Sequence, residues 1–168
     1  MIETRRLRCE PVTQAHAAPM FPLLSDTRIY THLPGGPPAS LDALRRRYRF
    51  LRDGVSPDGQ ERWLNWILVR RIDDCPLGFW QATVRAHDAS IAYVLHPDHQ
   101  GQGFATEAGD AILPYLFDRY PIDALRAEIA IDNQASKRLI ARLGFRWSHR
   151  DEAEGGDVYQ RPRPTMRS

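Results

Sequence analysis

The chain has 168 residues, of which 42% are hydrophobic and 26% are charged, and its formal net charge is +2. This length and balance are typical of one globular domain, so we expect a single domain over residues 1–168. The small net charge disfavours a protein that holds nucleic acid through a dense basic surface, and no apolar run is long enough to span a membrane.

The two cysteines, Cys9 and Cys75, form neither a metal-binding spacing nor a disulfide framework. The residues after Met1 also lack the apolar core of a secretory signal. We therefore expect a cytoplasmic protein with no metal site.

The first third of the chain predicts one strand followed by helices. Leu7–Pro11 is the expected first strand, and the Pro- and Gly-rich run at 34–38 is a loop between helical segments. Ser40 is placed to cap the helix behind this loop. One face of that helix is apolar and comprises Leu41, Leu44, Tyr48 and Leu51.

The same helix carries a basic cluster that comprises Arg45, Arg46, Arg47, Arg49 and Arg52. A run of charge on an amphipathic helix usually forms a solvated polar face. We interpret the cluster in this way, and not as a nucleic-acid site.

Three strands are expected next, over residues 62–71, 77–85 and 90–95. The loops between them are short and contain Asp73-Asp74 and His87-Asp88. Short polar loops favour an antiparallel meander of the three strands.

The remaining chain alternates helices and strands. A helix over 104–118 contains Pro114, which should kink it or shorten its regular part. A strand follows over 124–131, and the strand–helix–strand unit should form a right-handed crossover with its strands parallel or splayed.

Asp132-Asn133 can cap a last helix that ends before Gly144. A further strand begins at Phe145, and Val158-Tyr159 can pair with it. The order of elements indicates an α+β, or mixed α/β, fold.

A glycine-rich turn joins the strand at 90–95 to the helix at 104. Gly101 and Gly103 lie in this turn, just before the helix begins. Free backbone N–H groups and the helix dipole meet at such a point, which makes it a site for phosphate or pyrophosphate.

Two common types of phosphate loop fit poorly. A nucleoside-triphosphate loop needs lysine after the last glycine, where Phe104 stands. A dinucleotide fingerprint needs a third glycine, where Thr106 stands, and an immediate turn, whereas residues 96–100 precede Gly101. The simplest alternative is a tight turn with two small residues.

Two motifs together resemble the GNAT superfamily of N-acetyltransferases. The first is Gln100-Gly-Gln-Gly-Phe-Ala105, which fits the coenzyme A pyrophosphate pattern of that family. The second runs from Asn133 to Leu143-Gly144-Phe145, with the spacing of the family's second motif. Details of both helices are similar to the branch of ribosomal-protein N-terminal (alanine and serine) acetyltransferases.

The resemblance implies a mostly antiparallel, twisted central sheet that is splayed between the fourth and fifth strands and flanked by helices. It implies acetyl-CoA as cosubstrate, with its pantetheine arm in the splay and its pyrophosphate on the glycine loop. The residues implied in cofactor binding are Tyr93, Val94, Leu95, Gln100, Gly101, Gln102, Gly103, Phe104, Ala105, Thr106, Asn133 and Ser136.

Ser136 is the candidate catalytic residue. Many enzymes of the family carry a tyrosine seven residues after the asparagine, at the position of Ile140 here. Ser136, three residues after Asn133, is the available hydroxyl that could stabilise or protonate the leaving thiolate. Its alternative role, like that of Asn133, is to support the start of the helix.

No general base is nominated, although candidate groups lie on the relevant elements. His96 is expected to be a surface turn residue, and Glu107 is expected to stabilise the first turn of its helix. The other two are Asp98 and Glu128.

The acceptor side is expected from the N-terminal helices and the strand at 62–71. Its candidate residues are Tyr30, His32, Trp63 and Trp66, although packing is the preferred role for each. The leading hypothesis is direct acetyl transfer to a primary amine, either a protein N-terminus or a small molecule. The alternative is a non-catalytic acyl-CoA-binding or sensing module, and a homodimer is left open.

Overall fold

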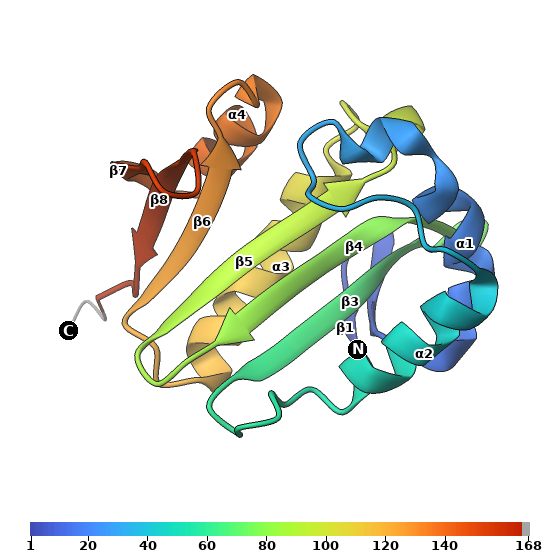
Figure 1. Ribbon diagram of the computed structural model, residues 1–168. Coiled ribbons are helices and arrows are strands. Elements are labelled where there is room, and N and C mark those ends of the chain that lie inside the picture. The colour runs from blue at the N-terminus through green and yellow to red at the C-terminus, as the bar shows by residue number, and fades with distance from the viewer. Residues whose placement is uncertain (166–168) are drawn as a thin grey trace.

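A computed structural model of the chain describes residues 1–165 (Figure 1). Its centre is an eight-stranded sheet in the order β1-β2-β3-β4-β5-β6-β8-β7. The strands are β1 (Ile2–Glu3), β2 (Leu7–Pro11), β3 (Arg62–Arg70), β4 (Cys75–Val84), β5 (Asp88–Leu95), β6 (Ala124–Ala130), β7 (Arg146–Asp151) and β8 (Gly156–Pro162). This confirms the mixed α/β fold, and the short β1 is a strand that the sequence did not predict.

Helices cover both faces of the sheet (Figure 1). α1 (Ala17–Ser25) and α2 (Leu41–Arg52) lie on one face, and α3 (Phe104–Arg119) lies on the other. α4 (Gln134–Arg142) follows β6, and three short 3₁₀ helices are η1 (Gln14–His16), η2 (Thr27–Tyr30) and η3 (Pro97–His99). The Ser40 hydroxyl caps α2 by accepting from the Ala43 amide at 3.0 Å, as its sequence position predicts.

Strand alternation divides the core into two clusters. Trp66, Trp80 and Ile91 point toward α3, whereas Ile67 and Val69 point toward α1 and α2. Successive residues of a strand face opposite sides, so each strand supplies both clusters. The arginine cluster of α2 is largely exposed, in agreement with a solvated face.

The predicted meander and the predicted splay are both present. β3, β4 and β5 pair antiparallel, and β5 pairs parallel with β6 from Asp88↔Ala124 to Ile91↔Ala127. Residues 92–95 have no partner on β6, so β5 and β6 separate toward the end that leads to the glycine loop. With β1 set aside, these are the fourth and fifth strands of the expected fold.

Pro114 does not shorten its helix, contrary to one of the two expected outcomes. α3 continues through Pro114 to Arg119. The proline removes the N–H that would bond the carbonyl of Asp110, and both residues are exposed, so water can satisfy that carbonyl. Within residues 1–165, no helix is both long and apolar enough to cross a bilayer.

Candidate active site

A cleft of about 530 Å³ lies where β5 and β6 separate. Its walls are the end of β5, the glycine loop, the first turn of α3, one side of α4, and the segment around η2. The residues that line it are Arg28, Ile29, Thr31, His32, Leu33, Tyr93, Val94, Leu95, Pro97, Gln100, Gly101, Gly103, Phe104, Ala105, Thr106, Asn133, Ala135, Ser136, Arg138, Leu139 and Arg142. Eleven of the twelve predicted cofactor residues are therefore brought together, and Gln102 is the exception.

The glycine loop presents a row of free amides to this cleft. Gly101 and Gly103 have φ angles of 73° and 80°, which side chains rarely adopt, and Gly103 is the N-cap of α3. Among the described residues, the amides from Gly101 to Thr106 donate to no backbone or side-chain acceptor. The first amide with a partner is that of Glu107, which donates to the Gly103 carbonyl. Six unpaired donors at a helix N-terminus form a site for an anion.

The N-terminal segment holds this loop in place. The Arg6 guanidinium donates to the Gln102 carbonyl at 3.0 Å and lies 4.3 Å from the centre of the Phe104 ring. Glu107 accepts from the Arg6 amide, the Arg6 Nε and the Thr4 hydroxyl at 2.8, 2.6 and 2.6 Å. Glu107 therefore does more than stabilise its own helix, because it ties α3 to the segment before β2.

The two glutamines of the loop use their side chains locally. Gln100 Nε2 donates to the Leu95 carbonyl at 3.0 Å, and Gln102 Nε2 donates to the Asp98 carbonyl at 3.3 Å. Each amide group keeps one N–H, so the role of these side chains as phosphate donors stays a prediction.

The opposite wall is the start of α4. The Asn133 Oδ1 accepts from the Ser136 amide at 3.1 Å, which caps the helix and leaves the Asn133 Nδ2 for another partner. Ser136 is half-buried and lines the cleft, whereas Ile140 is fully buried and lies outside it. The hydroxyl that α4 offers to the cleft is thus that of Ser136.

Tyr93 joins the two walls. Its ring stacks on Trp80 with the ring centres 4.8 Å apart, and its hydroxyl donates to the Ser136 carbonyl at 3.3 Å. Burial raises the pKa of Tyr93 to about 12, so the phenol stays protonated and can donate at neutral pH. This bond fixes the first turn of α4 relative to the end of β5.

A buried carboxylate behind α4 holds the helix from its other side. Asp157 on β8 accepts from Lys137 at 2.7 Å, from Arg150 at 3.1 Å and from Trp147 at 3.3 Å. The Lys137 ammonium and the Arg150 guanidinium hold the pKa of the Asp157 carboxyl well below its usual range. The carboxylate therefore favours the folded state at neutral pH.

Replacing Asp157 with asparagine should lower the free energy of unfolding at neutral pH. Because the folded pKa is depressed, this stabilisation is present above the unfolded pKa of about 4 and is lost as the pH falls through the folded pKa. Urea unfolding at several pH values should show the difference from the wild type narrowing below about pH 4. Asp118→Asn on the exposed side of α3 is the control, and a difference that does not change with pH would contradict this role for the charge.

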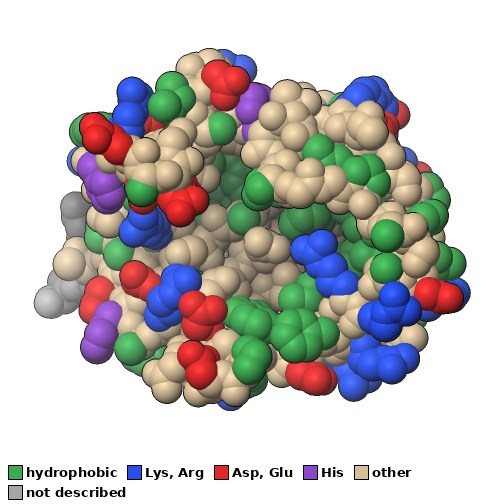
Figure 2. All heavy atoms as spheres, viewed as in Figure 1, with side chains coloured by type: hydrophobic (Ala, Val, Ile, Leu, Met, Phe, Trp, Pro, Cys, Tyr) green, Lys and Arg blue, Asp and Glu red, His purple; other side chains and the backbone are tan. Residues whose placement is uncertain are grey.

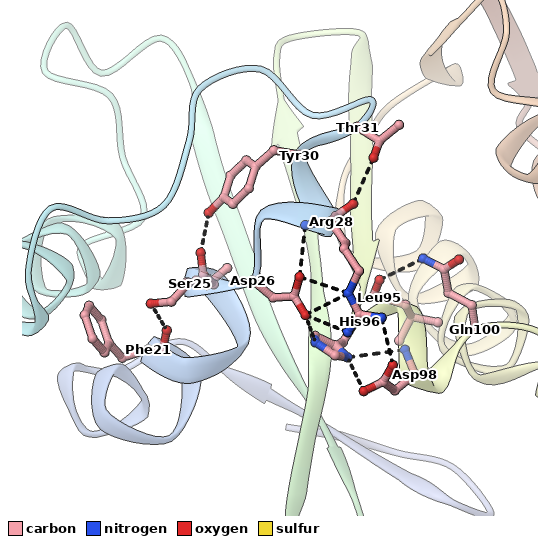
Figure 3. Close-up of polar contacts among 11 residues, drawn as sticks. Phe21, Ser25, Asp26, Arg28, Tyr30, Thr31, Leu95, His96, Asp98 and Gln100 are labelled. Atoms are coloured by element: carbon pink, nitrogen blue, oxygen red, sulfur yellow. Dashed lines mark hydrogen bonds and ion pairs between the residues drawn. The ribbon is translucent and has the colours of Figure 1, made fainter.

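His96 is not a surface turn residue, contrary to expectation. Its side chain is 14% exposed, and its Nε2 lies 2.9 Å from the Asp26 carboxylate (Figure 3). The Asp98 amide donates to the His96 Nδ1 at 3.3 Å, so Nε2 carries the proton and donates to Asp26. The pair ties the end of β5 to the start of η2. The two residues are 70 positions apart, so no local sequence pattern indicates this contact.

The four predicted acceptor-side residues, Tyr30, His32, Trp63 and Trp66, do not lie together in one place. Trp66 is 4% exposed, faces α3 and packs edge-on against Tyr115. Trp63 lies on the opposite face of β3, and Tyr30 donates its hydroxyl to the Leu24 carbonyl at 2.8 Å. Only His32 of the four lines the cleft, where its Nδ1 lies 3.4 Å from the Asp132 carboxylate across the splay.

Of the remaining candidate bases, Asp98 binds Arg28, and Glu128 is exposed on β6. The face seen in Figure 2 is hollowed over the sheet, and most of its charged side chains lie around the rim. No carboxylate is among the described residues that line the cleft. The structure therefore adds no candidate for a general base.

Three arginines in the cleft were missed from the sequence. Arg138 and Arg142 follow Ser136 on the cleft side of α4, at the i and i+4 spacing of one helix face, which could have indicated them. Arg28 comes from η2 and has no signal in the sequence, because its position depends on tertiary contacts with Asp26 and Asp98.

Comparison with known proteins agrees with this geometry. Residues 6–146 match the family model described as an acetyltransferase (GNAT) domain. The uncharacterized N-acetyltransferase YoaA of Bacillus subtilis is 24% identical over 150 residues, which cover 86% of this chain and 82% of YoaA.

Solved structures share the fold at low sequence identity. RimL, a ribosomal L7/L12 α-N-protein acetyltransferase solved with coenzyme A, is 18% identical, with a TM-score of 0.82 over 96% of this chain and 98% of RimL. The Salmonella typhimurium acetyltransferase that modifies the N-terminal serine of L7/L12 is 18% identical, with a TM-score of 0.78 over 96% of this chain and 97% of that chain. The aminoglycoside acetyltransferase AAC(6')-Ib with coenzyme A and kanamycin is 17% identical, with a TM-score of 0.73 over 94% of each chain.

The family model spans β2 to the start of β7, which includes the splayed strands, the glycine loop and α4. Its match agrees with the two sequence motifs and with the sheet that they predict. The chain belongs to the GNAT acetyltransferase family and is an acetyl-CoA-dependent N-acetyltransferase.

Proposed function

We propose that the protein transfers the acetyl group of acetyl-CoA directly to the α-amine of a polypeptide N-terminus. The observation that carries this proposal is that Ser136 and five of the six glycine-loop residues with unpaired amides line one continuous cleft. A molecule with a pyrophosphate at one end and a thioester at the other matches this arrangement.

Each part of the cleft has a role in the proposal. The amides from Gly101 to Thr106 bind the pyrophosphate, and Arg138 and Arg142 add positive charge beside it. The free edge of residues 93–95 pairs with the amides of pantetheine, as an added strand would. The Asn133 Nδ2, which the cap leaves available, binds a pantetheine carbonyl.

The transfer step needs few groups from the protein. The amine lone pair attacks the thioester carbonyl carbon, and the carbon–sulfur bond breaks as the thiolate leaves. Ser136 donates a hydrogen bond to the sulfur as its negative charge develops. The ammonium gives one proton to water before the attack, which is feasible for an α-amine with a pKa near 8, and the nitrogen gives a second proton to water as the tetrahedral intermediate collapses.

The charge of the cleft favours a peptide over a polycationic amine. Its charged or titratable lining residues are Arg28, His32, Arg138 and Arg142, and no described lining residue is acidic. An aminoglycoside carries several ammonium groups, whereas the carboxylates beside the lining residues, those of Asp26, Asp98 and Asp132, are already paired with Arg28 or His32. A peptide N-terminus carries one amine beside neutral amides.

Release of free coenzyme A, measured with a panel of acceptors, tests the proposal. We expect acetylation of short peptides with a free N-terminus, none of the same peptides with a blocked N-terminus and an internal lysine, and little of kanamycin. Preferred turnover of kanamycin would contradict the peptide proposal. Tight binding of acetyl-CoA without turnover of any amine would instead support a sensing module.

A further inference from the structure

Arg28 lines the cleft and is bound there by two carboxylates, those of Asp26 and Asp98 (Figure 3). Its Nε lies 3.1 Å from both oxygens of Asp26, and its Nη2 lies 2.7 Å from one of them. Its Nη1 donates to Asp98 at 3.2 Å. Asp26 is itself fixed by the His96 Nε2 and by the Arg28 amide, both at 2.9 Å.

These bonds leave part of the guanidinium free. It has five N–H groups, and the contacts with the two carboxylates use one on Nε, one on Nη1 and one on Nη2. One N–H on each Nη has no acceptor within the part of the chain that the structure describes. The side chain is 56% exposed and lines the cleft, so both groups are available to a ligand.

The local charge indicates a neutral acceptor atom. Asp26 and Asp98 carry two negative charges against the single positive charge of Arg28. An anion placed here would face a net negative surrounding. A carbonyl oxygen can accept both N–H groups without that cost.

The cofactor has other partners for its oxygens. Its pyrophosphate has the glycine-loop amides with Arg138 and Arg142, and its pantetheine has the edge of β5 with Asn133. Arg28 belongs to a different wall of the cleft, the segment around η2, which also contributes Ile29, Thr31 and His32. The acceptor polypeptide, which is the second substrate, is therefore the ligand that can accept the free N–H groups of Arg28.

We infer that Arg28 is an acceptor-recognition residue, which donates its two remaining N–H groups to a main-chain carbonyl within the first two residues of the acceptor polypeptide. Asp26, Asp98 and His96 act as positioning residues that aim the guanidinium. This inference rests on the proposed function and sharpens it, because it explains why an α-amine beside a peptide carbonyl would be preferred to an amine without one.

The test combines two enzymes with matched acceptors. Arg28→Gln is compared with the wild type on a short peptide and on analogues in which a trans-alkene replaces the first or the second peptide bond. Losing a hydrogen bond between a charged donor and a carbonyl should lower kcat/KM for the peptide by roughly 10- to 100-fold. The dissociation constant of acetyl-CoA should not change.

The alkene at the recognised position should lower the wild-type kcat/KM by a similar factor but should have little further effect on Arg28→Gln, because both changes remove one interaction. Arg28→Lys keeps the charge but not the planar donors, and should lose most of the preference as well. Arg46→Gln, an exposed arginine on α2, is the control for loss of a surface charge.

Three results would overturn the inference while leaving the proposed function intact. These are peptide turnover unaffected by Arg28→Gln, equal losses on the peptide and on both alkene analogues, or a weaker affinity for acetyl-CoA as the sole effect. If the variants fail to fold, the wild-type comparison of peptide and alkene analogues still decides whether a carbonyl is recognised. Absence of any peptide acetylation by the wild type would instead contradict the proposed function.

Discussion

Replacing Ser136 with alanine is expected to lower kcat by roughly 100-fold, while the dissociation constant of acetyl-CoA stays the same. The Ser136 amide and carbonyl hold the structure through Asn133 and Tyr93, and these main-chain bonds do not need the hydroxyl. The change should therefore affect the leaving thiolate and not the fold. Steady-state kinetics, acetyl-CoA binding and thermal unfolding of the variant measure the three effects.

Two further variants make this test specific. Ser136→Thr keeps a hydroxyl and should retain more activity than Ser136→Ala. Ser148→Ala removes an exposed hydroxyl from β7, which is not among the elements that line the cleft, and should be neutral. An unchanged kcat for Ser136→Ala would limit Ser136 to the first turn of α4.

Replacing Gly78 with alanine is expected to destabilise the protein by about 3 kcal/mol, which would lower its Tm by roughly 6–12 °C. A Cβ at this position would lie 1.9 Å from the Val94 carbonyl oxygen and 2.9 Å from the Leu95 Cα. Both contacts are with backbone, so the two strands would have to move apart. Thermal unfolding measures the loss.

The strand that moves is the one expected to bind pantetheine. Gly78 pairs with Leu95, and Phe79 pairs with Val94, beside the splay. Gly78→Ala should therefore also weaken the binding of acetyl-CoA. Gly36→Ala is the matched control, because a Cβ at Gly36 would have no atom within 4 Å, and a Gly78→Ala protein with an unchanged Tm would refute the close approach.

The parts of the site that local sequence determines could be predicted. The glycine loop needs residues with positive φ at two positions, and glycine stands at both Gly101 and Gly103. Asn133 begins α4 as a side-chain cap, and Gly144 ends it with a φ of 83°. These signals are local and predict the loop and the ends of α4, whereas the resemblance to the family implied that the two lie on one cleft.

Contacts between distant segments could not be predicted in this way. His96 has the sequence of an exposed turn, and its burial depends on Asp26 at the start of η2. The sequence offers both Trp63 and Trp66 as candidates for the acceptor side. Residues three apart on a strand face opposite sides, so β3 places the two tryptophans on opposite faces of the sheet. The orientation of the Arg28 guanidinium depends on its hydrogen bonds to Asp26 and Asp98, which the sequence does not reveal.

A crystal structure with acetyl-CoA bound tests the central claim most directly. We expect the pyrophosphate within hydrogen-bonding distance of the amides of the glycine loop, and the thioester sulfur between Leu95 and the Ser136 hydroxyl. Acetyl-CoA bound outside the splay between β5 and β6, or bound there with its sulfur away from Ser136, would contradict the account.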